Sequence, residues 1–130
     1  MRYLPLAALL AFSTVAGATP GTMTVGEYLA RATALKAEGF MALFSPEYRL
    51  LKSEGAQALS AYTTQLAAER ASGHPSSCPP GSVRVNSDIV LNHLRTYPAG
   101  MRDRVDIREA VADYYQRTWP CRRPTLAGNP

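Results

Sequence analysis

The sequence predicts an all-α fold, a compact bundle of four or five helices with one structural disulfide. Apolar residues recur at spacings of three and four along four segments of the chain, which is the helical period. Capping residues and Gly or Pro breakers separate these segments. No segment alternates apolar and polar residues as a half-buried strand does, and only residues 83–85 look extended.

Length and composition limit the classes of protein to which the chain can belong. It has 130 residues, of which 46% are hydrophobic and 18% are charged, so we expect one folded domain. A domain of this size supports one core but no deep enclosed active site in addition. Together with a formal net charge of only +4, these figures argue against a large enzyme, a multi-pass membrane protein and a dedicated nucleic-acid binder.

Residues 1–18 are predicted to form a signal peptide that is cleaved near Ala18. A short basic start precedes an apolar run, and Ala16-Gly17-Ala18 supplies the small residues that a signal peptidase requires. The alternative is an uncleaved membrane anchor, but a spanning helix needs about 20 apolar residues and this run is shorter. We therefore expect a periplasmic or secreted protein without stable membrane insertion.

Cys78 and Cys121 are the only cysteines. An even number of cysteines in an exported chain favours a structural disulfide over a reactive thiol. The bridge would close a loop of roughly 44 residues and stabilise the fold by about 4 kcal/mol in the chain-entropy model. It would also fix a segment that has little else to hold it.

The first helix is expected to begin after Thr24 and to end at Gly39. Thr24 and Glu27 have the spacing of a capping box, and Gly39 offers a left-handed stop. Residues 40–44 then form a short apolar connector, which we expect to be buried.

Ser45-Pro46 predicts the start of a second helix, because a capping hydroxyl precedes a proline at the first helical position. One apolar stripe continues as far as Leu66, and the helix is expected to run to Ala71. Gly55 lies in the middle of this helix and indicates either a close helix contact or a break into two segments.

The clearest loop covers residues 73–82, which include three prolines and two glycines. Asn86 or Ser87 is then expected to cap a third helix, which Pro98 ends because the residue before a proline avoids helical geometry.

A fourth helix is expected from about Asp103 and stops before Pro120. Its predicted inner face consists of Ile107, Val111, Tyr114 and Thr118. The single helical domain thus covers residues 19–121, and residues 122–130 are expected to form a flexible C-terminal tail.

No residue pattern predicts an enzyme, and we expect no catalytic residue, metal or cofactor. His74 and Cys78 are four residues apart, but they lie in a proline-rich loop that lacks two further zinc ligands. His93 falls on an apolar helix face without a serine elbow or an acid singled out by spacing, which favours a packed structural histidine. Pairs such as Asp113 and Arg117 are typical of a solvated helix face rather than of paired catalytic carboxylates.

The basic excess lies in the C-terminal part of the chain. Residues 19–76 carry five basic and five acidic residues, whereas residues 77–130 carry eight arginines against five acids. Arginine is favoured at interfaces because its planar fork forms hydrogen bonds and stacks. Such a surface fits an acidic protein, an envelope polyanion or lipid headgroups, although general solubility explains it equally well. Nucleic acid is not an expected partner.

Three motifs follow one another in the C-terminal half: Cys78-Pro79-Pro80, a helix ending in Leu94-Arg95-Thr96-Tyr97-Pro98, and a helix ending in Thr118-Trp119-Pro120-Cys121. Their order resembles the Rap/Tai family of type VI secretion immunity proteins. The N-terminal half departs from the family pattern, since it has no further cysteine and no Gly-Tyr-x-x-Gly segment.

The resemblance implies a small helical periplasmic protein, often a homodimer, that binds and blocks a peptidoglycan-degrading amidase effector. It also implies that Cys78 and Cys121 take the bridging positions and that no catalytic residue carries over.

The sequence therefore favours an exported immunity or inhibitor protein. The alternative is a small periplasmic chaperone or stress protein of the Hde type, which would also be helical, exported and single-disulfide. A small hydrolase is least favoured, because no convergent nucleophile, base and oxyanion site is indicated. The predicted partner contacts, chosen for their place in the irregular segments, are Ser82, Arg84, Arg95, Arg102 and Arg104.

Overall fold

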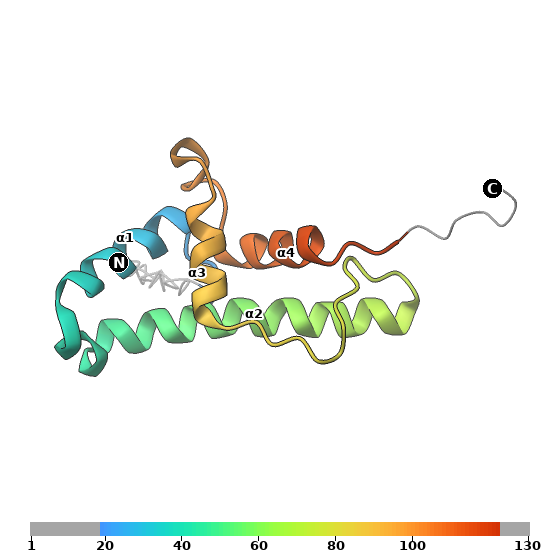
Figure 1. The fold of residues 1–130 in the computed structure, drawn as a ribbon, viewed down its shortest axis with the longest axis horizontal. Coiled ribbons are helices and arrows are strands. Elements are labelled where there is room, and N and C mark those ends of the chain that lie inside the picture. The colour runs from blue at the N-terminus through green and yellow to red at the C-terminus, as the bar shows by residue number, and fades with distance from the viewer. Residues whose placement is uncertain (1–18, 123–130) are drawn as a thin grey trace, which may run out of the picture.

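The computed structural model describes residues 19–122, and this part of the chain is all-α, as the sequence predicts. It contains four α-helices, two short 3₁₀ helices and no strand (Figure 1). In chain order these are α1 (Val25–Ala37), η1 (Gly39–Phe44), α2 (Pro46–Ser72), α3 (Ser87–Arg95), η2 (Ala99–Met101) and α4 (Ile107–Thr118). The predicted signal peptide lies outside the described residues, as does the predicted tail apart from Arg122. No helix in the described range is long and apolar enough to cross a bilayer.

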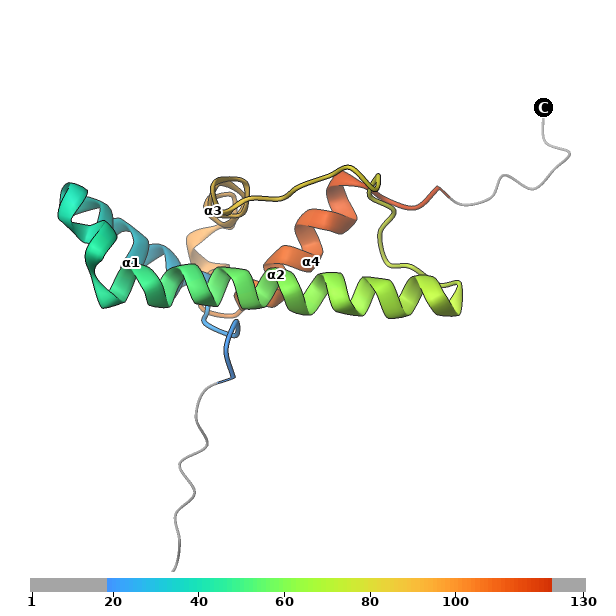
Figure 2. The ribbon, with the colours of Figure 1, turned by 90° about the horizontal axis from the view of Figure 1, so that it is seen from below.

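The other helices assemble on α2, which has 27 residues and is about 40 Å long at 1.5 Å per residue. In Figure 1, α1 and α4 lie above opposite halves of α2, and α3 stands between them. Figure 2 shows α3 end-on beside α2. Every α-helix contributes to one core, whose larger members include Val25, Leu29, Leu51, Tyr62, Leu66, Val90, Leu94, Ile107, Val111 and Tyr115.

The helix signals around α2 are confirmed. The hydroxyl of Ser45 accepts a hydrogen bond from the Tyr48 N–H at 3.1 Å, and Gly73 ends the helix with a φ of 81°. Gly55 marks a close contact rather than a break, because a Cβ at this position would lie 3.2 Å from the hydroxyl of Tyr28. A side chain at position 55 would force this hydroxyl, which bonds the Leu51 carbonyl of α2, to shift by a few tenths of an ångström.

The capping box predicted for α1 forms only in part. The Thr24 hydroxyl accepts a hydrogen bond from the Glu27 N–H at 3.1 Å, as expected. The Glu27 carboxylate does not return to the backbone of Thr24, because it forms an ion pair with Arg31 at 2.8 Å. The left-handed stop is confirmed by the φ of 74° at Gly39.

The first turns of α1 and α4 meet at an isolated β-bridge between Thr24 and Asp106. The N–H of Val25 donates to the carbonyl of Val105 at 2.8 Å, and the N–H of Ile107 donates to that of Met23 at 2.9 Å. Amide donors at helix starts have no partner within their own helix, so this bridge satisfies one donor from each.

The prediction that the fourth helix begins near Asp103 is wrong by about one turn. Asp106 caps α4 instead, in a capping box that Glu109 completes, and the segment before it forms turns around η2. The predicted inner face also shifts, since Thr118 is exposed and Tyr115 is buried.

The C-terminal end of α4 is fastened to the loop after α2. Cys78 and Cys121 form the predicted disulfide, with their Cα atoms 5.0 Å apart, and the Cys78 N–H donates to the carbonyl of Trp119 at 2.8 Å. The Tyr62 hydroxyl on α2 shares hydrogen bonds with the hydroxyl of Ser77 at 2.7 Å and that of Ser76 at 3.0 Å. The loop is thus held to both α2 and α4.

Candidate protein-binding surface

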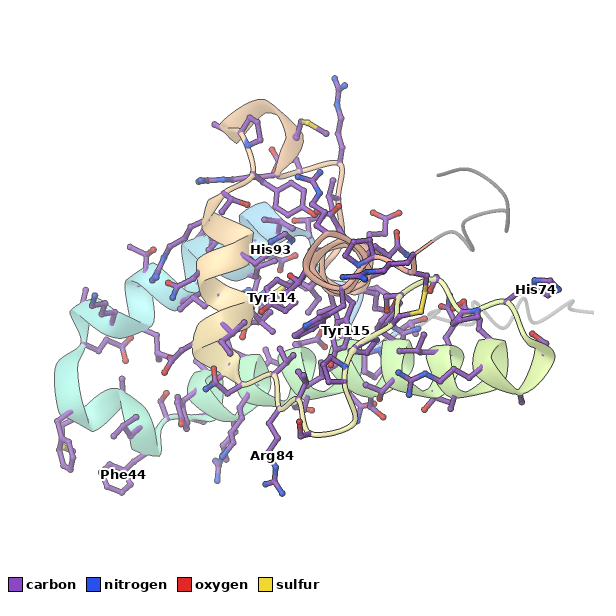
Figure 3. All side chains as sticks on the ribbon, turned by 45° about the vertical axis from the view of Figure 1, so that its right-hand side comes forward. Phe44, His74, Arg84, His93, Tyr114 and Tyr115 are labelled. Carbon is purple, nitrogen blue, oxygen red and sulfur yellow. A yellow bond between two sulfur atoms is a disulfide. The ribbon has the colours of Figure 1, made fainter. Side chains whose placement is uncertain are left out.

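Four large apolar side chains project from the turn between α1 and α2. Phe40 and Met41 are 73% and 72% exposed, Phe44 is 68% exposed and Leu43 is 48% exposed. We call these four residues the apolar tip. Figure 3 shows Phe44 pointing away from the body of the molecule. The expectation that this connector is buried is therefore wrong.

The geometry of the turn explains this exposure. Only Glu38, η1 and Ser45 separate α1 from α2, and Ala42 is the one buried residue of η1. The Ser45 hydroxyl donates to the Ala42 carbonyl at 2.7 Å, and the rings of Phe40 and Phe44 pack edge to face at 5.7 Å. The sequence did contain a signal for this exposure, namely the close spacing of the Gly39 stop and the Ser45-Pro46 start. So short a turn cannot direct every apolar residue inward.

A groove continues from the apolar tip along the line where α1, α2 and α3 meet. It consists of three adjoining hollows of about 360, 250 and 230 Å³. The first and second share Ala32 and Tyr48 as walls, and the second and third share Tyr28 and Lys52. Because neighbouring hollows share walls, they form one surface, which we call the interhelical groove.

The groove has a fixed floor. The hydroxyl of Tyr28 donates to the carbonyl of Leu51 at 3.3 Å, and burial, aided by the charge of Glu54, raises the pKa of this tyrosine. Arg31 on α1 lies 3.1 Å from the Glu47 carboxylate on α2, which ties the two helices together near the tip. The groove is therefore formed before any partner arrives.

The predicted contact residues do not form one surface. Ser82 and Arg84 are exposed before the start of α3, and Arg84 points away from the body in Figure 3. Arg95 and Arg104 are exposed near the opposite end of that helix. Nine residues of α3, about 13 Å, separate the two groups.

Arg102 has a structural role within this set. Its Nε donates to the carbonyl of Tyr97 at 2.9 Å, and an Nη donates to that of Arg95 at 3.1 Å. Carbonyls at a helix C-terminus lack partners in the helix and attract positive charge, so Arg102 caps α3.

His93 is the packed histidine that the sequence predicts. It lies between the rings of Tyr97 and Tyr114, with centroids 5.4 and 5.3 Å away. Its Nε2 is 3.3 Å from the Asp113 carboxylate, without hydrogen-bond alignment. Asp113 also accepts hydrogen bonds from the Tyr97 hydroxyl at 2.8 Å and from Arg117 at 2.6 Å.

Burial is the largest influence on His93 and lowers its pKa, although the charge of Asp113 acts in the opposite direction. No sequence pattern predicts that Asp113 and His93 meet, since they come from different helices. The predicted pair of Asp113 and Arg117 is confirmed.

In the part of the chain that the structure describes, no cluster of three His, Cys, Asp or Glu residues is placed to hold a metal ion. His74 lies exposed beyond the end of α2 and points into solvent in Figure 3. Cys78, four residues further along the chain, is bonded to Cys121 in the disulfide.

Comparison with known proteins identifies no relative: no family model, curated protein or solved structure matches the chain.

Proposed function

We propose that this protein is an exported inhibitor of the immunity type, which binds a toxic cell-wall-degrading enzyme and blocks it. The observation that carries the proposal is the apolar tip. Exposed apolar side chains normally occur singly, whereas a contiguous patch is typical of an interaction site. Four such residues on one six-residue helix form a patch of this kind.

The shape of the tip favours insertion into a concave partner. It lies at one end of the molecule, where α1 turns into α2 (Figure 1). Buried aromatic anchors at the centre of an interface contribute most of its binding energy. Phe40 and Phe44 already pack against each other, so the ordering cost of binding is small. A protruding, preformed apolar end suits the cleft of an enzyme.

The motif order that resembles the Rap/Tai family supports the choice of target, a peptidoglycan amidase effector. It also supports the homodimer as part of the proposal. The disulfide suits a periplasmic or secreted protein, because such bonds persist in oxidising compartments.

A periplasmic chaperone is the second candidate, and the same exposed tip favours it, because apolar surface also binds unfolded clients. The two functions differ in the number of partners. A chaperone would suppress the aggregation of several unrelated proteins at low pH, whereas an inhibitor would protect none and would block one enzyme.

The proposal is tested by capturing exported proteins of the same organism on the purified, oxidised protein and assaying the captured enzyme for amidase activity. We expect one stoichiometric partner whose activity falls on binding, and we expect Phe40→Ser/Phe44→Ser to lose it. Arg95→Glu/Arg104→Glu is the matched surface variant, and a comparable loss would assign the contact to the arginines. Failure of the protein to inhibit any exported hydrolase would refute the proposal.

A further inference from the structure

We infer that the interhelical groove is a docking site for an amphipathic helix of a partner protein, one that carries acidic residues beside its apolar face. This surface adjoins the apolar tip, because Phe40 and Leu43 also line its first hollow, but the inference does not depend on the proposed inhibitor function.

The length and lining of the groove suit an apolar helix face. From Tyr48 to Leu59 it follows α2 for about 16 Å, the length of three helical turns. Its three hollows lie one after another, so large side chains spaced at i, i+4 and i+7 would each find one. Leu35, Ala56 and Leu91 are among the apolar walls.

The backbone chemistry of the walls favours a helical partner over an extended peptide. An extended strand needs partners for its own N–H and C=O groups, which a sheet edge supplies. The walls of this groove are helices, whose backbone groups are bonded within each helix. A helical partner satisfies its own backbone and presents only side chains.

The charges of the groove select an acidic partner. Lys36 lies on its wall near the tip and Lys52 lies near its middle, and both are exposed. Neither lysine takes part in an ion pair with any residue of the described range. Asp88 is the one acid on the walls of the three hollows, so lysine outnumbers acid there. Complementary charges of this kind set specificity and speed association.

The experiment uses two stapled helical peptides as probes, each with leucines at i, i+4 and i+7. One has glutamates and the other lysines on both flanks of the leucine face. Fluorescence anisotropy with the oxidised protein should show binding of the acidic peptide and weaker binding of the basic one. Lys52→Glu should weaken the acidic peptide about tenfold and strengthen the basic one.

Ala56→Trp, which fills the third hollow, should abolish binding, whereas Ala67→Trp, on the same helix but lining none of the three hollows, should not. The inference is overturned if the acidic peptide does not bind, or if Lys52→Glu leaves both affinities unchanged. It is also overturned if sedimentation shows a second copy of the chain in the groove, as a dimer that Ala56→Trp dissociates. Phe44→Ser changes a tip residue that lines none of the three hollows and should leave peptide binding intact, so failure of the inhibitor proposal is a separate result.

Discussion

The two ends of the molecule differ in whether their large apolar side chains are packed or exposed. At the disulfide end, the ring of Tyr115 packs at a tilt against those of Tyr62 and Trp119, with centroids 4.8 and 5.3 Å away, and the loop is bonded to both helices. At the other end, η1 exposes all four of its large apolar side chains.

This difference indicates that stability and recognition are assigned to different parts of the chain. Burying a Phe or Leu side chain stabilises a fold by roughly 1.5–3 kcal/mol, and the tip forgoes this gain at four positions. The disulfide end instead packs its aromatic side chains into or against the core that every α-helix shares. Substitutions at the two ends should therefore act on different measurable quantities.

The largest effect on stability is expected from loss of the disulfide. Cys78→Ser/Cys121→Ser should lower the free energy of unfolding by about 4 kcal/mol, because the bridge spans a sequence separation of 43 residues and restricts the unfolded chain. Urea unfolding, followed by circular dichroism, measures this change. The wild-type protein under reducing conditions is the control and should behave like the variant. An unchanged midpoint in both would mean that the disulfide end is stable without its bridge.

Tyr62→Phe should have the next largest effect, about 1–3 kcal/mol. The substitution removes the hydroxyl group that forms a hydrogen bond with the Ser77 hydroxyl. Because Ser77 is fully buried, its hydroxyl then loses this partner. Tyr48→Phe is the matched control, because its hydroxyl forms no hydrogen bond with the described residues, and we expect a change within about 0.5 kcal/mol. Equal losses for both variants would show that the hydroxyl of Tyr62 is dispensable.

The sequence predicted the disulfide end better than the tip, for a physical reason. Caps, stops and the cysteine pair are local or countable signals. Ser45 starts α2, Gly73 ends it and Cys78 forms the disulfide, as these signals predict. Contacts between helices depend on how the helices are packed, which periodicity does not specify. The contact of His93 with Asp113 and the interhelical groove are of this second kind, and so is the placement of the predicted contact residues at the two ends of α3.

Acid should weaken the contact between α3 and α4, with a smaller effect on stability than that of Tyr62→Phe. Burial lowers the pKa of His93 below its usual 6.5, so the unfolded chain binds a proton more readily than the folded protein does. The stabilising contribution is therefore present above pH 6.5 and is lost as the pH falls through the lowered pKa. His93→Gln should flatten this dependence between about pH 7.5 and about pH 5. His74→Gln, at an exposed position, is the control, and an equal effect of both variants would contradict the assignment.

The smallest effect on stability is expected from substitutions at the tip. This result tests most directly whether the tip contributes to recognition rather than to stability. Phe40→Ser/Phe44→Ser should change the free energy of unfolding by no more than about 0.5–1 kcal/mol, because both rings are mostly exposed and lose chiefly their mutual contact. Binding of a hydrophobic dye to the native protein should fall at the same time. A loss of stability as large as that of the disulfide variant would instead mean that these rings belong to the core, and the contrast between the two ends would disappear. Stability retained while dye binding and partner binding are lost would show that the tip is kept apolar for recognition.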